Sequence, residues 1–120
     1  MPGALRRYFE VLDGPDGERA LEFLADELRF SILFSTPDGH AREFAGGRPE
    51  FDAYMRRRGA PDWKHHVLAE FGGADVELVL GQTRRDGAVI ATFVAAIQLD
   101  ADGRITRYVV GRPPAVAFAA

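Results

Sequence analysis

The first half of the chain repeats apolar residues at the three- and four-residue spacing of helices. One such stripe predicts a first helix, which ends at the turn 13–17, and it consists of Leu5, Tyr8, Phe9 and Leu12. A second stripe predicts another helix, capped by Asp16, and it consists of Leu21, Leu24, Ala25 and Leu28. A third helix is predicted from about Pro49 to Arg58, because proline suits a first helical turn and Gly59 closes the last one.

The rest of the chain alternates apolar and polar residues in the way that strands require. Phe30, Ile32 and Phe34 predict a half-buried strand, which the turn 36–39 joins to a short return strand at 42–45. Further strands are predicted over about 64–71, 76–84, 88–99 and 104–110. They are separated by glycine-containing pairs typical of hairpin turns, at 72–73, 86–87 and 102–103. The second half should therefore form an antiparallel meander.

Together these elements predict an α+β fold, in which a curved, mostly antiparallel sheet wraps around three helices from the first half of the chain. We expect a single domain over 1–120, with its core at about 5–110 and a C-terminal tail at 111–120. The strand at 88–99 has apolar residues on both faces, namely Val89, Ile90, Phe93, Val94 and Ile97. Both faces should therefore be covered, one by helices and a pocket and the other by a second subunit.

Composition narrows the class of protein. Hydrophobic residues make up 47% and charged residues 28%, which excludes an intrinsically disordered chain. The net charge of −3 disfavours a general nucleic-acid binder, which is normally basic. The absence of cysteine excludes disulfides, thiolate nucleophiles and cysteine-ligated metals. No apolar run is long enough to span a bilayer and residues 1–11 lack a signal-peptide pattern, so we expect a cytoplasmic protein without membrane or nucleic-acid partners.

Several short segments carry a resemblance to a known family. In order, they are 5–9, 24–27 leading into Phe30, 44–47, 65–67 and 99–105. With this order of elements, the chain resembles the SnoaL-like branch of the nuclear transport factor two-like superfamily over about 5–110. The resemblance implies a cone-shaped, cystatin-like fold around an apolar pocket and a homodimer formed through the sheet. Such proteins include polyketide cyclases, ketosteroid isomerases, dehydratases, epoxide hydrolases and proteins that only bind, so the resemblance specifies fold well and chemistry poorly.

The ketosteroid isomerase branch provides the sharpest comparison. That branch places a tyrosine donor on the first helix, a base aspartate on the first strand and an aspartic acid on the penultimate strand. The last of these stays protonated because its surroundings are apolar. Tyr8 matches the tyrosine position, but the two acid positions fall on or next to Ile32 and Ala95. Because neither residue ionises, the resemblance does not imply the chemistry of that branch here.

His65 is the leading candidate for proton transfer. It matches the histidine that many SnoaL-like sequences carry at the start of this strand, and an unperturbed histidine pKa near 6.5 suits a base at neutral pH. The alternative is a histidine bonded to a backbone carbonyl at the pocket rim. His66 should point to the opposite face, so the two imidazoles cannot bind one metal together. The resemblance implies His65 as base or acid and Tyr8 as an oxyanion donor, with no cofactor and no metal.

Amphipathic aromatic residues are the candidates for ligand contacts. Tyr54, Trp63 and Tyr108, together with Phe93, should line the pocket and clamp a planar ligand, or else pack in the core with their polar atoms bonded locally. On the strand 76–84, Gln82 or its neighbour Thr83 would supply a hydrogen bond to the ligand, or would be a polar residue at the sheet edge.

Two charged features have a simpler interpretation. Glu70 would be a base with a raised pKa if it faced the interior, but the opposite side of its strand is more apolar, which favours a solvated position at the edge. The basic run 56–58 is interpreted as a solvated helix face, partly paired with Glu50 and Asp52. The apolar segment 113–118 would lie across the dimer seam or the pocket mouth, or would be a frayed tail.

Two functions remain open from the sequence. The first is a cofactor-independent cyclase, isomerase or dehydratase that acts on an apolar or aromatic organic molecule by general acid–base chemistry. The second is a non-catalytic ligand-binding or dimerisation module of the same fold. Hydrolysis of an epoxide would need paired carboxylates around an arginine, and the inward-facing positions do not supply that set. In either case we expect a small apolar organic ligand and a homodimer.

Overall fold

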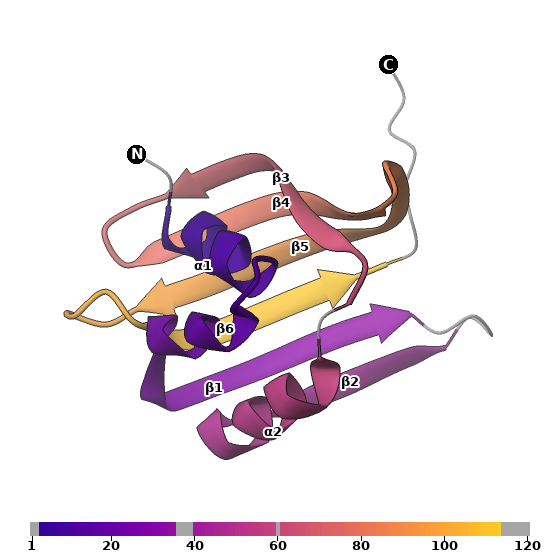
Figure 1. Cartoon of the computed structure of the whole chain (residues 1–120). Helices are drawn as coiled ribbons and strands as arrows, with labels where there is room; N and C mark the ends of the chain where they lie inside the picture. The colour runs from indigo at the N-terminus through magenta and orange to yellow at the C-terminus, as the bar shows by residue number, and fades with distance from the viewer. Residues whose placement is uncertain (1–2, 36–39, 60, 114–120) are drawn as a thin grey trace.

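The structure of the protein is a computed structural model, and it describes residues 3–35, 40–59 and 61–113. Its helices are α1 (Ala4–Leu12), the 3₁₀ helix η1 (Gly17–Phe23) and α2 (Arg48–Arg58). Its strands are β1 (Leu24–Ser35), β2 (Ala41–Gly47), β3 (Lys64–Gly72), β4 (Val76–Arg85), β5 (Ala88–Leu99) and β6 (Ile105–Arg112) (Figure 1). The strands form one six-stranded sheet in the order β2-β1-β6-β5-β4-β3.

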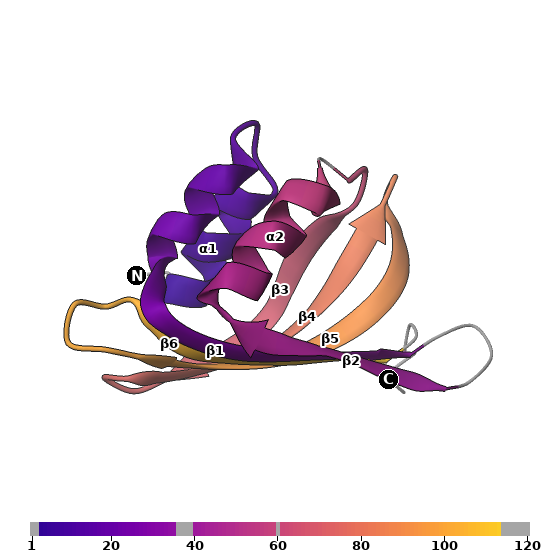
Figure 2. The ribbon, with the colours of Figure 1, turned by 90° about the horizontal axis from the view of Figure 1, so that it is seen from below.

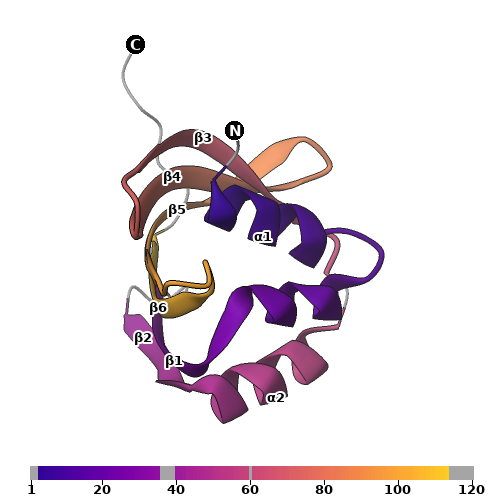
Figure 3. The same ribbon diagram turned by 90° about the vertical axis from the view of Figure 1, so that its left-hand side faces the viewer.

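The sheet is strongly curved, and its concave side holds the helices. Strand β1 pairs in parallel with β6, whereas every other pair of neighbouring strands is antiparallel. Figure 2 shows α1 and α2 on the same side of the sheet, and Figure 3 shows β3, β4 and β5 bending around α1. This arrangement confirms the predicted α+β cone. It also confirms the predicted hairpin at Asp86 and Gly87, whose φ angles of 51° and 81° suit a two-residue turn.

The predicted second helix is wrong over most of its length. Only η1 is helical, without a capping bond from the Asp16 side chain, and β1 already begins at Leu24. Leu24, Ala25 and Leu28 are buried as expected, but as strand residues. The pairing of β1 with β6 slips between Leu24 and Arg29, which marks a bulge. A bulge interrupts the two-residue alternation of a strand, and here it leaves the buried residues at a helix-like spacing.

The core lies between the helices and the concave face of the sheet. The apolar stripe of α1 is buried, and it packs toward the inward side chains of β4, β5 and β6, including Val79, Phe93 and Ile97. Gly81 on β4 is paired with Phe93 on β5. A Cβ atom at residue 81 would overlap the Phe93 ring, so the glycine is what allows this ring to lie flat across the sheet.

The convex face of the sheet carries exposed apolar side chains, which we call the outer apolar face: Phe71, Leu78, Val94 and Val109. Cross-strand pairing gathers them, because Phe71 lies opposite Leu78, and Val109 lies opposite Ala96, two residues from Val94. On β5, the residues that face the concave side are buried, whereas Val94 faces the convex side and is 56% exposed. Coverage of this face by a second subunit therefore stays a prediction.

The sheet extends further toward the C-terminus than the sequence predicts. Strand β6 continues to Arg112, so the first residues of the expected tail belong to the sheet, and the Thr92 N–H donates to the Pro113 carbonyl at 3.3 Å. The predicted turn at 36–39 and the tail segment 114–120 lie outside the described residues. Within the described ranges, no helix combines the length and the apolar character needed to cross a membrane.

Candidate functional site

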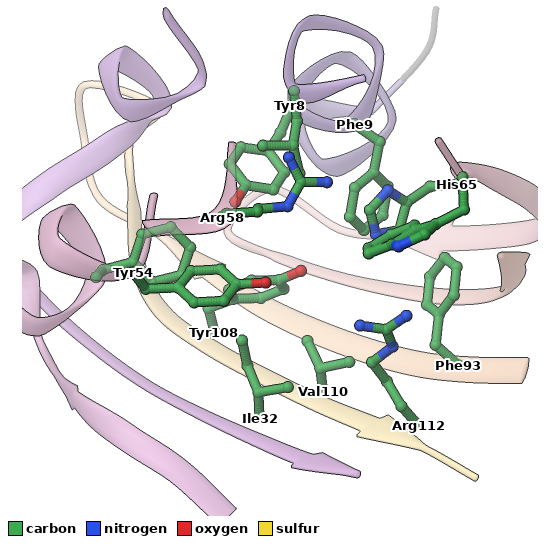
Figure 4. A pocket seen from close by; sticks show the side chains of 13 residues that line it. Tyr8, Phe9, Ile32, Tyr54, Arg58, His65, Phe93, Tyr108, Val110 and Arg112 are labelled. Carbon is green, nitrogen blue, oxygen red and sulfur yellow. The ribbon is translucent and has the colours of Figure 1, made fainter. Parts of the chain in front are cut away.

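A pocket lies between the helices and the concave face of the sheet (Figure 4). Its lining combines aromatic, aliphatic and basic side chains, namely Tyr8, Phe9, Leu12, Ile32, Phe51, Tyr54, Arg58, Trp63, His65, Phe93, Tyr108, Val110 and Arg112. The cavity volume is about 30 Å³, and roughly 10–15 Å³ is the minimum for one ordered water. In this conformation the pocket has room for a few atoms only, and a larger guest requires side chains to move.

Most of the predicted site residues meet around this pocket. Tyr8 comes from α1, Tyr54 from α2, Phe93 from β5 and Tyr108 from β6. Trp63 directly precedes β3 and His65 is its second residue, and all six line the pocket. The structure does not bring Gln82 to it. Gln82 lies opposite the exposed His66 on the convex side of the sheet, where its Oε1 accepts hydrogen bonds from Arg84 at 2.8 and 3.1 Å. The prediction that Gln82 contacts the ligand is therefore wrong for this pocket, because strand residues alternate between faces.

Asp13 and His65 form a buried pair at the edge of the pocket. Asp13 directly follows α1, and its Oδ2 accepts a hydrogen bond from the His65 backbone N–H at 2.7 Å. The two carboxylate oxygens also lie 3.0 and 3.1 Å from His65 Nδ1. The side chains of Asp13 and His65 are 9% and 10% exposed. An ionised carboxylate can only accept, so Nδ1 carries the proton and Nε2 is the basic nitrogen of the ring.

Aromatic rings enclose the imidazole of His65. Phe9 stacks on it with 4.2 Å between ring centroids and 11° between ring planes, and Trp63 and Phe93 approach edge-on at 5.2 and 5.5 Å. Burial lowers the pKa of His65, and this effect outweighs the hydrogen bond and the charge of Asp13, which raise it. His65 is therefore neutral near pH 7, which is the form that accepts a proton.

Two guanidinium groups lie over the ring of Trp63. Arg58 ends α2 and Arg112 ends β6, and their Cζ atoms are 5.1 and 4.9 Å from the Trp63 centroid, within the range of cation–π contacts. Nη2 of Arg58 also lies 3.7 Å from Oδ1 of Asp13. Burial lowers the pKa of Arg112. The lining thus contains two basic side chains and no carboxylate among the residues that form it.

Tyrosine hydroxyls supply the neutral donors of the site. The rings of Tyr8 and Tyr108 meet edge-to-face with 5.9 Å between centroids, and Tyr8 and Tyr108 are nearly fully buried. Burial raises the pKa of Tyr8 and of Tyr108, with like-charge repulsion between the tyrosines as the next cause. Both hydroxyls therefore stay protonated and can donate. Figure 4 shows the oxygen atoms of Tyr8, Tyr54 and Tyr108 directed toward the space between them.

The other carboxylates considered from the sequence have positions outside the pocket lining. A bulge between Val67 and Ala69 changes the register of β3 and places Glu70 opposite the inward Val79. There Glu70 accepts a hydrogen bond from Nε of Arg6 on α1 at 3.1 Å, with its side chain 30% exposed. This is a partly solvated ion pair at the helix, close to the edge position that the sequence favoured.

Two positions of the ketosteroid isomerase comparison lie where the resemblance implied. Ile32 lines the pocket, and Ala95 is fully buried on the concave side of β5. Both positions are inward and carry no ionisable group, so the carboxylate in this site comes from Asp13 instead. Among the residues that the structure describes, no three histidine, cysteine, aspartate or glutamate side chains gather as a metal site would require.

A wider hollow of about 400 Å³ lies on the outer side of the Asp13–His65 pair, between α1 and β3. Its lining includes the charged residues Arg6, Glu10 and Lys64 as well as the pair itself. His65 therefore belongs to the wall between the pocket and a groove open to solvent. This position would let protons exchange between the imidazole and water.

Sequence reasoning missed three residues of the site. Asp13 was interpreted only as the turn that ends the first helix, and nothing local in the sequence links it to His65. The prediction that Arg58 belongs to a solvated helix face is wrong, since its side chain is 6% exposed. The signal for Arg58 was present, because it shares the helical stripe of Phe51 and Tyr54. Arg112 faces inward because it continues the two-residue alternation of Tyr108 and Val110, but the predicted strand ends at residue 110, before Arg112.

Comparisons with known proteins identify the fold. No protein-family profile and no curated protein sequence matches the chain. Among solved structures, a SnoaL-like family protein of Agrobacterium tumefaciens, described as a candidate isomerase, is 16% identical, with a TM-score of 0.70 over 91% of this chain and 93% of its own. A candidate ketosteroid isomerase from Kribbella flavida is 19% identical, with a TM-score of 0.67 over 98% of this chain and 80% of its own.

A third solved structure is similar to the chain over almost its whole length. An NTF-2 like protein of unknown function from Burkholderia xenovorans is 12% identical, with a TM-score of 0.69 over 97% of this chain and 84% of its own. The chain has the SnoaL-like, NTF2-like fold, as the resemblance predicted. At such identities the likeness concerns the fold, and the chemistry has to be argued from this chain's own residues.

Proposed function

We propose that the protein is a cofactor-independent enzyme that moves a proton on a small organic molecule, of the isomerase, cyclase or dehydratase type. The single observation that carries this proposal is the Asp13–His65 pair, which presents a neutral imidazole in an aromatic pocket. A histidine held by a carboxylate through Nδ1 is the arrangement that general bases use, because the carboxylate fixes the tautomer and stabilises the imidazolium that forms.

In the first step, Nε2 of His65 removes a proton from a carbon next to a carbonyl group of the substrate. The electron pair of the broken C–H bond moves to the carbonyl oxygen and forms an enolate. The resulting imidazolium is stabilised by the Asp13 carboxylate, to which Nδ1 continues to donate. The protonated hydroxyls of Tyr8 and Tyr108 are the donors that would stabilise the enolate oxygen, and they would act strongly because the pocket is largely shielded from water.

In the second step, the imidazolium returns its proton, and the type of reaction depends on where it goes. Return to a different carbon gives an isomerisation. Donation to a hydroxyl group on the neighbouring carbon releases water and leaves a double bond, which is a dehydration. Attack of the enolate carbon on a second carbonyl, which takes up the proton, closes a ring. The geometry supports the proton transfer that these reactions share.

A non-catalytic binding module is the second candidate, and one observation favours it. The cavity volume of about 30 Å³ leaves space for a few atoms only, whereas ligand pockets usually measure roughly 300–1,000 Å³. A protein with this pocket could bind without reacting. The two candidates differ in one respect: only the enzyme needs the basic nitrogen of His65.

The test measures exchange of carbon-bound hydrogen for deuterium in cyclohexanone, a small ketone, dissolved in D₂O with the protein. We expect the protein to accelerate loss of the α-proton signal in NMR spectra. His65→Gln and Asp13→Asn should each slow the exchange by about 10²–10⁴-fold, the usual contribution of a general base. The matched control is His66→Gln, since His66 is adjacent but exposed on the other face.

The result separates the candidates. Exchange by the parent protein and the His66 variant, lost in the two variants of the pair, supports the enzyme. Equal exchange in all variants, or no acceleration by a parent protein whose NMR spectrum shows that cyclohexanone binds in the pocket, would overturn it in favour of the binding module.

A further inference from the structure

The pocket holds more positive charge than its surroundings neutralise. Arg58 and Arg112 both line it, and the nearest carboxylate, Asp13, lies behind His65 and outside the lining. Asp13 already accepts two hydrogen bonds from His65, one from the backbone and one from the ring. The only carboxylate within ion-pair distance of either guanidinium group, among the described residues, is therefore Asp13 beside Arg58, and it is already engaged with His65. Uncompensated buried charge is costly.

Arg58 shows the deficit at a single atom. Its side chain is 6% exposed, and its Nη2 is buried without a hydrogen-bond partner in the part of the chain that the structure describes. The 3.7 Å between Nη2 and Asp13 Oδ1 is within ion-pair range but too long for a hydrogen bond. A buried N–H donor left unsatisfied costs roughly as much as a lost hydrogen bond. In Figure 4 the guanidinium of Arg58 points into the space bounded by Tyr8, Tyr54 and His65.

Arg112 supplies the second charge from the opposite side. It ends β6 and lies over the Trp63 ring, 4.9 Å from its centroid. Within the described ranges, no acidic side chain lies within ion-pair distance of Arg112. Two cations therefore contact the same indole ring, and Nη2 of Arg58 is a donor without a partner among the described residues. Planar guanidinium groups with free N–H donors match the two oxygens of a carboxylate.

We infer that the ligand of this pocket is a small planar organic acid, whose carboxylate is bound between Arg58 and Arg112. The inference rests on the proposed function for the pocket and adds the charge of the substrate. The aromatic lining suits a flat ring or conjugated chain attached to the acid group. The cavity of about 30 Å³ has room for a few atoms only, so binding of the whole acid requires lining side chains to move.

The test uses the fluorescence of Trp63, the only tryptophan of the chain, as a direct reporter of the pocket. Benzoate is the probe, and benzamide is its neutral counterpart of almost the same shape. We expect benzoate to change the Trp63 emission and to bind at least about 10-fold more tightly than benzamide, the ratio expected for one charge-assisted hydrogen bond. Acetate, which has the charge without the ring, should bind more weakly than benzoate.

Variants connect the charge preference to the two arginines. Arg58→Met and Arg112→Met should each weaken benzoate binding by about 10-fold or more and leave benzamide binding nearly unchanged. The matched control is Arg57→Met, which removes an exposed arginine one residue away on α2. Thermal melts will show whether each variant folds. Arg112 lies at a strand end and is less buried than Arg58, so Arg112→Met can be tested even if Arg58→Met does not fold.

The outcomes are distinct from those of the exchange test. Benzoate selectivity that depends on Arg58 or Arg112 supports the inference, and acetate binding as tight as benzoate would overturn the planar ring. Equal affinity for benzoate and benzamide, or a benzoate preference unaffected by either variant, would overturn the anionic ligand. If that happens while cyclohexanone exchange still requires His65, the proposed function stands and only the charge of its substrate is wrong.

Discussion

Glu77 of β4 holds the N-terminus of α1, and we predict that Glu77→Gln measurably destabilises the protein. Its carboxylate oxygens accept hydrogen bonds from the backbone N–H groups of Ala4 at 2.8 Å and Leu5 at 3.0 Å. The residue before the helix is Gly3, which has no side chain to cap it. The first N–H groups of a helix have no partner within the helix, so a carboxylate from a neighbouring strand takes the place of a local cap.

The magnitude follows from two contributions. Loss of a capping side chain costs about 0.5–2 kcal/mol. A negative charge at a helix N-terminus contributes about 0.3–1 kcal/mol. Glutamine keeps the shape and one acceptor oxygen but loses the charge, so we expect about 1 kcal/mol for Glu77→Gln. For a chain of this length, that corresponds to a melting temperature lower by roughly 3–6 °C.

The assay is thermal and urea unfolding followed by circular dichroism, with Glu70→Gln as the control. Glu70 also connects a strand to α1, but through the Arg6 side chain in a pair that is about one third exposed. Such pairs contribute little, so the control should lose less than about 0.5 kcal/mol. If the Glu70 variant loses as much stability as the Glu77 variant, or the Glu77 variant loses none, the capping explanation is refuted.

Three other predictions concern pH, packing and assembly. Because folding lowers the pKa of His65, the unfolded chain binds a proton first as pH falls below about 6.5, and the free energy of unfolding drops. Urea titrations should show a smaller drop between about pH 7 and pH 5 for His65→Gln than for the parent protein, and equal drops would contradict this. Gly81→Ala should cost about 1–3 kcal/mol in the same assay by displacing Phe93, and no loss would contradict that contact. Val94→Lys on the outer apolar face should turn a dimer into a monomer in light scattering, and a monomeric parent protein would refute the expected dimer.

The fold was largely accessible from the sequence because its main signals are local. The glycine-containing turns determine where β3 to β6 begin and end, and the stripe of Leu5, Tyr8 and Phe9 determines the buried side of α1. The error at Leu24 has a physical cause. A bulge makes a strand imitate the spacing of a helix, and only the pairing of β1 with β6, which joins distant parts of the chain, decides between them.

The chemistry of the site was only partly accessible, because it depends on contacts across long sequence separations. The aromatic residues and His65 could be placed by alternation along one strand or helix face. Asp13 could not, since its partner is 52 residues away and its local role as a helix end was a sufficient explanation. Arg58 was misplaced for a related reason: three consecutive arginines suggest solvent, although the helical period turns only the third one inward.

The burial of Asp13, Arg58 and His65 argues that the pocket is a functional site and not only part of the hydrophobic core. An aliphatic residue at Arg58 would pack beside Phe51 and Met55 without the cost of desolvating a charge, and buried ion pairs are weak contributors to stability. A binding module would account for the arginines, because an anionic guest would neutralise them. It would also account for the 3.7 Å ion pair of Asp13 with Arg58, but not for the shorter contacts of both Asp13 oxygens with Nδ1 of His65. A carboxylate that accepts the Nδ1 proton of a buried imidazole has a clear use when that imidazole changes its protonation state. Asp13→Asn is therefore the substitution that best distinguishes an enzyme from a binding protein. It removes a negative charge beside Arg58, so it should not weaken benzoate binding, whereas it should slow proton exchange by about 10²–10⁴-fold.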